Sequence, residues 1–91
     1  NPAADARLKA ARPRLEQRAI ELRMPTENLL TPETLRRLAW SPPNPLDLPA
    51  VEAALASHGA RPWQIAYTAQ MILDAFVDSV NGEAIRAETT S

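Results

Sequence analysis

The side chains best suited to binding a charged ligand are arginines near the start of the chain. Arg7, Arg14 and Arg18 recur at helical spacing and would line one flank of a helix over residues 3–22. Guanidinium groups in such a row can contact successive phosphates of a nucleic acid. The alternative is a solvated helix face with local ion pairs, for example between Arg18 and Glu21. The spacing of the arginines leaves both interpretations open.

A second group of candidates lies at the start of the last predicted helix, where Arg61, Trp63, Gln64 and Tyr67 follow one another closely. Helical spacing places both aromatic rings away from the apolar face of that helix. Exposed aromatic rings beside an arginine can stack on bases or anchor a protein partner. The competing interpretation is that a neighbouring helix or the proline-rich loop covers both rings.

The sequence contains no arrangement typical of a catalytic site. Its carboxylates are scattered over polar helix faces and capping positions, whereas two-metal nuclease chemistry needs several carboxylates that converge on the ions. His58 is the only histidine and has no partner at metal-ligand spacing. We therefore predict no catalytic residue, no metal site and no cofactor for this chain.

Composition limits the class of protein further. The 91 residues are enough for one modest core, and the absence of cysteine is compatible with a reducing cytoplasm, where we expect the protein. No apolar run is long enough to cross a membrane. The overall charge of −1 conceals a basic balance of +3 over residues 1–24 and an acidic balance of −4 beyond them. Such a domain can present a basic face, but it lacks the basic excess typical of tight nucleic-acid binders.

Apolar periodicity and proline positions predict an all-α fold of four main helices and a single helical turn. The first helix carries Pro13 in its interior, where we expect a kink. In the turn, Leu29 and Leu30 should plug the core, and Gly59 should stop the third helix. The expected elements are helices over 3–22, 31–40, 47–59 and 62–80, and a turn within 24–30.

The second of these helices carries the clearest local instructions. Thr31 is a suitable N-cap and Pro32 suits the first helical position. Leu35 and Leu38 share its inward face, and we expect Trp40 to be buried where the helix meets the proline-rich loop. The inward faces predicted for the last two helices are formed by Leu48, Val51, Leu55 and His58, and by Ile65, Ala69, Ile72, Leu73, Phe76 and Val80.

Several short segments together resemble the HRDC domain, the helical module shared by RecQ-type helicases and ribonuclease D. The similarity covers about residues 5–77. Within it, Leu-Thr-Pro-Glu-Thr-Leu at 30–35 and Ala-Arg-Pro-Trp-Gln at 60–64 are similar to the C-terminal region of bacterial ribonuclease D-like 3′–5′ exonucleases. Segments 7–10, 21–25 and 35–43 add to the resemblance.

The resemblance implies a compact, orthogonally packed HRDC-like bundle over 1–80. The residues that follow have little to bury, so we expect a flexible tail over 81–91. The resemblance also implies an accessory role in a larger metal-dependent exonuclease, whose catalytic domain lies elsewhere in the same polypeptide. The expected ligand is single-stranded RNA or DNA, bound weakly by a monomer. The alternative is a structural or protein-docking module without affinity for nucleic acid.

Overall fold

The chain folds into helices joined by short connections. In the computed structural model, residues 1–90 are described, with side chains described through residue 81, and no strand occurs within that span. The all-α prediction is therefore confirmed. The helices are α1 (Pro2–Leu22), α2 (Thr26–Leu29), α3 (Pro32–Trp40), α4 (Leu48–Ser57) and α5 (Pro62–Thr90).

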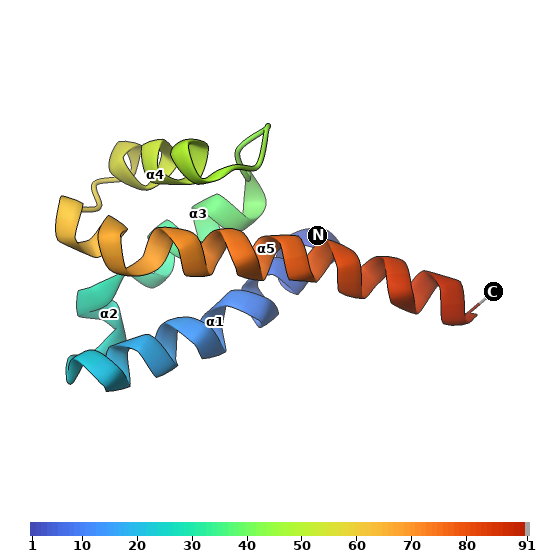
Figure 1. Cartoon of the computed structure of the whole chain (residues 1–91), viewed down its shortest axis with the longest axis horizontal. Coiled ribbons are helices and arrows are strands. Elements are labelled where there is room, and N and C mark those ends of the chain that lie inside the picture. Colours follow the sequence, from blue (N-terminus) through green and yellow to red (C-terminus); the bar gives the residue numbers. More distant parts are fainter. Residues whose placement is uncertain (91) are drawn as a thin grey trace.

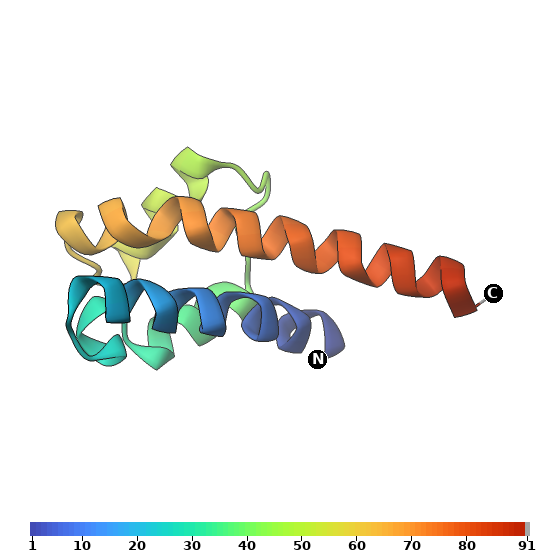
Figure 2. The same ribbon diagram turned by 60° about the horizontal axis from the view of Figure 1, so that its bottom comes forward.

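The first and last helices, α1 and α5, lie side by side and antiparallel, and they share the largest interface of the bundle (Figures 1 and 2). Helix α4 packs on α5 from the other side, and α3 contacts both α1 and α4. The last part of α5 extends beyond the other helices. This arrangement brings residues near position 14 close to residues near position 78.

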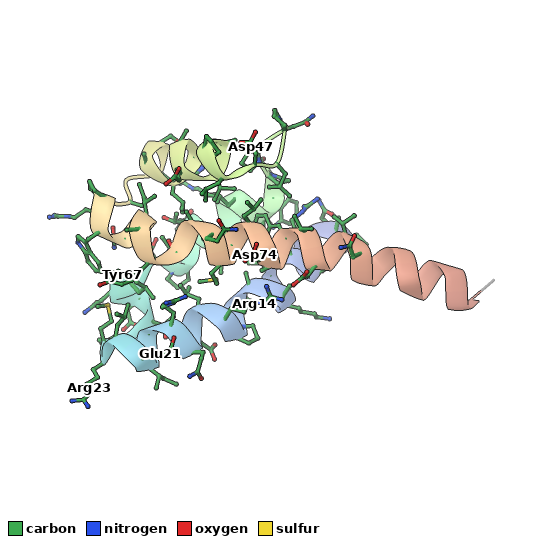
Figure 3. The ribbon with its side chains drawn as sticks, in the orientation of Figure 1. Arg14, Glu21, Arg23, Asp47, Tyr67 and Asp74 are labelled. Atoms are coloured by element: carbon green, nitrogen blue, oxygen red, sulfur yellow. The ribbon has the colours of Figure 1, made fainter. Side chains whose placement is uncertain are left out.

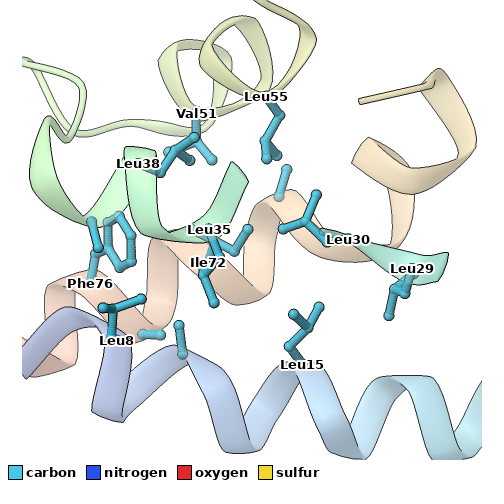
Figure 4. Close-up of a cluster of buried hydrophobic side chains, with 14 of the residues drawn as sticks. Leu8, Leu15, Leu29, Leu30, Leu35, Leu38, Val51, Leu55, Ile72 and Phe76 are labelled. Carbon is cyan, nitrogen blue, oxygen red and sulfur yellow. The ribbon is translucent and has the colours of Figure 1, made fainter. Parts of the chain in front are cut away.

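One hydrophobic core joins all five helices within the described span (Figure 4). From α1 it receives a stripe that alternates alanine with leucine, and the small alanines allow α5 to approach closely. Leu29 and Leu30 from α2 are both fully buried, which confirms their predicted role as a plug. The largest fully buried side chains are Phe76, Leu29, Leu30, Leu38, Leu55, Ile72 and Val51.

The residues around Pro13 remain helical, so α1 is a single helix. Asn1 caps its start, because its side-chain oxygen accepts hydrogen bonds from the backbone N–H groups of Ala3 and Ala4. At its end Arg23 adopts a left-handed conformation with φ of 56°, and this reversal leads the chain into α2.

Helix α3 begins as predicted. The hydroxyl oxygen of Thr31 accepts a hydrogen bond from the backbone N–H of Thr34, and Pro32 occupies the first turn. The predicted burial of Trp40 is wrong, because 53% of that residue is exposed. At about 100° of rotation per residue, Trp40 lies well outside the arc that contains Leu35 and Leu38.

Helix α4 also begins with its predicted cap, a 2.9 Å hydrogen bond from the N–H of Ala50 to Asp47. The prediction that His58 faces inward is wrong, because His58 is exposed. The helix ends at Ser57, so the side chain that follows no longer continues its inward stripe. Gly59 then takes a φ of 90° and ends this element, as its position in the sequence predicted.

The buried stripe of α5 differs from the predicted one. Val80 is 52% exposed although the adjacent Ser79 is buried, so the buried face of α5 is turned away from Val80. Thr68 and Ser79 are buried instead, and their hydroxyls donate 2.7 Å hydrogen bonds to the carbonyls of Gln64 and Phe76. A hydroxyl satisfied within its own helix can enter a core at little cost, and a pattern of apolar residues alone does not predict this.

Helix α5 also runs to Thr90, well past its predicted end at Val80. The tail that we predicted to be flexible covers residues 81–91. Side chains are described only through residue 81, and Ser91 lies outside the described residues. The flexibility of this tail stays a prediction.

Candidate functional site

A groove of about 480 Å³ runs between α1 and α5 on the outer surface. Figure 3 shows Arg14 on α1 and Asp74 on α5 at its two banks, with Tyr67 closer to the start of α5. Met71, which packs against the core, contributes to the floor. The lining residues are Pro13, Arg14, Gln17, Arg18, Glu21, Gln70, Met71 and Asp74.

Two of the predicted arginines form the α1 bank of this groove, and each has an acidic neighbour. Arg14 Nη2 lies 2.5 Å from Asp78 Oδ2 on α5, which makes an ion pair between the two helices. Arg18 Nε lies 3.9 Å from Glu21 Oε1, at the limit of ion-pair distance. Both arginines remain more than a third exposed, so they can exchange these partners for a ligand.

Arg7 is not part of the groove. Its Nη1 donates a 2.6 Å hydrogen bond to the carbonyl of Ala39, in the last turn of α3. Carbonyls in the last turn of a helix lack intrahelical partners, so this contact caps α3 and ties it to α1. The structure thus brings Arg14 and Arg18 together and gives Arg7 a structural contact.

The opposite bank of the groove is acidic and amide-bearing. Gln70 donates a 2.9 Å hydrogen bond to Asp74 Oδ1, one helical turn further along α5. Asp78 follows by another turn and holds Arg14. Beyond this ion pair the surface becomes more acidic, because Asp47, Asp74 and Asp78 line a second depression beside Leu73 and Val77.

The aromatic rings at the start of α5 are exposed. Trp63 is 42% exposed and Tyr67 is 44% exposed, so their neighbours cover each residue only in part. One helical turn separates them, and they share a side of α5. Arg61 is exposed immediately before this helix. These three side chains can meet a ligand together.

Gln64 has a structural task at the same place. Its Oε1 accepts a 2.7 Å hydrogen bond from the backbone N–H of Arg61, and its Nε2 donates to the carbonyl of Asn28 at 3.1 Å. The first contact is that of a capping box, and the second ties α5 to α2. The spacing of Gln64 after the start of α5 could have suggested this role from the sequence.

The scan of known families gives a match over residues 1–76 to the 3′ to 5′ exonuclease C-terminal domain. This chain belongs to that family. No curated protein and no solved structure matches it. The match to the exonuclease C-terminal domain contains the aromatic pair and every residue that lines the groove, and it ends two residues before Asp78.

Two other kinds of feature, a cluster of metal ligands and a membrane-spanning helix, are absent from the described residues. Among the side chains described, no three of His, Cys, Asp or Glu gather where they could hold a metal ion. Within the described residues, no helix has the length and apolar character needed to span a bilayer.

Sequence reasoning missed the residues that complete the site. Asp74 and Asp78 lie on the polar side of α5, and their position opposite Arg14 depends on how two helices distant in sequence pack. Ile20, 69% exposed near the end of α1, is a further exposed apolar residue that the helical pattern did not single out. No local signal in the sequence predicts the pairing of Arg14 with Asp78.

Proposed function

We propose that this chain is a non-catalytic accessory domain of the HRDC type that helps a ribonuclease D-like 3′–5′ exonuclease hold single-stranded RNA or DNA. Family membership supports the exonuclease context. One observation carries the binding role: a groove with Arg14 and Arg18 on one bank lies on the same α1–α5 surface as the exposed rings of Trp63 and Tyr67.

The chemistry of this surface suits a single strand. Arginines contact phosphates without regard to sequence, and aromatic rings stack on any base. Arg61 adds a cation at the start of α5, beside Trp63. The site residues we retain are Arg14, Arg18, Arg61, Trp63 and Tyr67, whereas Arg7 and Gln64 act through the fold.

Catalysis belongs, in this proposal, to a separate metal-dependent domain of the same polypeptide. The described carboxylates support this division of labour, because Asp47 caps a helix, Asp78 pairs with an arginine and Asp74 accepts from an amide. The accessory domain would work as a monomer in the cytoplasm, without a cofactor of its own.

A chemical-shift titration with short single-stranded RNA tests the binding role. Two or three phosphate contacts are few, so we expect a dissociation constant on the order of 10⁻⁴ M or weaker at physiological salt. Shifts should concentrate on the Trp63 indole, on Tyr67 and on the guanidinium of Arg18. Shifts confined to Asp47 and its neighbours, or none at millimolar RNA, would contradict the proposal.

A second candidate function is a protein-docking module without affinity for nucleic acid. It is favoured by the net charge of −1 and by the engagement of Arg7 and Arg14 inside the domain. The same titration separates the two functions, because a docking module leaves the spectrum unchanged when RNA is added. Tyr67→Ala adds a second comparison. If a base stacks on Tyr67, this substitution should weaken RNA binding by about 1–3 kcal/mol.

A further inference from the structure

The ion pair between Arg14 and Asp78 lies between two depressions of the α1–α5 surface that differ in their charged residues. On one side the groove contains two arginines, Arg14 and Arg18, two glutamines, and the carboxylates of Glu21 and Asp74. On the other side, three aspartates and a single arginine surround an apolar floor. Arg14 lines both depressions, so the partner that this guanidinium holds determines whether its positive charge is available to a ligand in the groove.

We infer that Asp78 is a built-in competitor of phosphate, which holds Arg14 in the free domain and gives it up when a nucleic acid strand enters the groove. This inference rests on the proposed nucleic-acid function and concerns the regulation of that site. In the free state the strand finds Arg18 available at the near end of the groove. It gains Arg14 only by displacing a carboxylate.

The strength of the ion pair fits such an exchange. The Arg14 side chain is 39% exposed and the Asp78 side chain is 57% exposed, so water and salt screen their attraction. Exposed ion pairs typically contribute less than about 1 kcal/mol, which a phosphate that offers two oxygens to the same guanidinium can replace. A buried pair would not allow this exchange, because separation would leave a charge without a partner.

Asp74 provides a matched control within the same helix. It carries the same charge as Asp78, lies one helical turn away and lines the second depression together with Asp78, but its partner is the neutral Gln70. Removal of either carboxylate changes the net charge equally. Only removal of Asp78 releases an arginine.

The experiment measures binding of a fluorescein-labelled oligouridylate by anisotropy, at a series of salt concentrations, for Asp78→Asn and Asp74→Asn. Each substitution is made in the natural sequence and in an Arg14→Gln background. We expect Asp78→Asn to tighten binding by up to about fivefold, because the strand no longer has to displace an exposed carboxylate, whereas the slope of log K against log salt should stay nearly the same because Arg14 contacts the strand in both chains. In the Arg14→Gln background the two asparagine variants should behave alike, because no arginine remains to be released.

The outcomes separate this inference from the proposed function. Suppose that the natural chain binds RNA and that Asp78→Asn gives the same gain in affinity with and without Arg14. Asp78 then weakens binding only through its negative charge, and the proposed competition between Asp78 and phosphate for Arg14 is overturned. An unchanged affinity for Asp78→Asn overturns it as well. If neither chain binds at millimolar RNA, the nucleic-acid function itself fails, and the competition fails with it. Binding by Asp78→Asn alone would overturn the exchange as well, because it would show that a strand cannot displace Asp78 from Arg14 in the natural chain.

A second measurement follows Arg14 directly. In the natural chain, added RNA should move the Arg14 side-chain N–H resonances toward their position in RNA-bound Asp78→Asn, while circular dichroism confirms that each variant is folded. Resonances that stay in place at saturating RNA would show that the ion pair survives binding, and this would contradict the exchange.

Discussion

Helices α1 and α5 form two very different regions along one interface. In the buried seam between them, Ala11, Ile72 and Phe76 have no exposed surface. A few ångströms outward, the groove contains charged side chains that are a third to more than a half exposed. Packing energies fix the seam, whereas the contacts of the groove are weak enough to be exchanged. The fold therefore holds a stable scaffold directly beneath an adaptable surface.

Substitution of the aromatic core residue tests the seam and should have the largest effect. Phe76→Ala removes a fully buried ring from the core (Figure 4), which should cost about 3–5 kcal/mol. A domain of this size has only about 5–14 kcal/mol in total, so the variant should be close to unfolding. Urea denaturation followed by circular dichroism measures the loss.

The matched control for this variant is Val80→Ala, one helical turn further along α5. Val80 is 52% exposed, so its truncation should change stability by less than about 0.5 kcal/mol. Equal losses from the two variants would mean that the seam extends to the projecting part of α5, and the contrast between the two regions would disappear.

The sequence predicted the seam well because burial follows local periodicity. The alternating alanines and leucines of α1, the leucine plug after it and the caps at Thr31 and Asp47 can all be recognised from neighbouring residues. The errors had different causes. The helical phase of Trp40 already places it outside the inward face of α3, whereas His58 follows the end of α4, and Val80 lies at the edge of a buried face that includes Ser79. Apolar periodicity alone does not show where a helix ends or which part of an apolar face its neighbours cover.

The groove was less predictable, for a related reason. Of the predicted row of Arg7, Arg14 and Arg18, only the last two line the groove, while Trp63 and Tyr67 are partly exposed away from the apolar face of α5. Their partners depend on the packing of α1 against α5, which joins residues more than sixty positions apart. Charge patterns along one helix carry no information about such contacts.

Trp40→Ala tests a large side chain outside the seam and should have a moderate effect. Because 53% of this residue is exposed, the substitution removes only part of the apolar contact that a buried tryptophan provides. We expect a loss of about 1–2 kcal/mol, below the 3–5 kcal/mol of a fully buried aromatic ring. A loss as large as that of Phe76→Ala would place Trp40 in the core in solution. Thermal and urea unfolding of both variants under the same conditions provide the comparison.

Substitution of Gln64 tests the contacts that hold the start of α5, and it should have a smaller effect on stability. Gln64→Ala should cost about 1 kcal/mol, because it leaves the N–H of Arg61 without its capping partner. Gln64→Glu keeps an oxygen acceptor at that position and should restore most of the stability, while it loses the hydrogen bond donated to Asn28. If Gln64→Ala weakens RNA binding with no change in stability, Gln64 contacts the ligand directly, contrary to its position in the structure.

The smallest effect on stability is expected from the ion pair at the end of the groove. A double-mutant cycle of Arg14→Gln and Asp78→Asn should give a coupling below about 1 kcal/mol, since both side chains are largely solvated. The coupling should decrease further as salt rises from 0.01 M to 1 M, because the screening length falls from about 30 Å to about 3 Å. A salt-independent coupling of several kcal/mol would mean that the pair belongs to the scaffold. In that case the boundary between the fixed seam and the adaptable groove would lie further out, and Arg14 could not be released to a ligand.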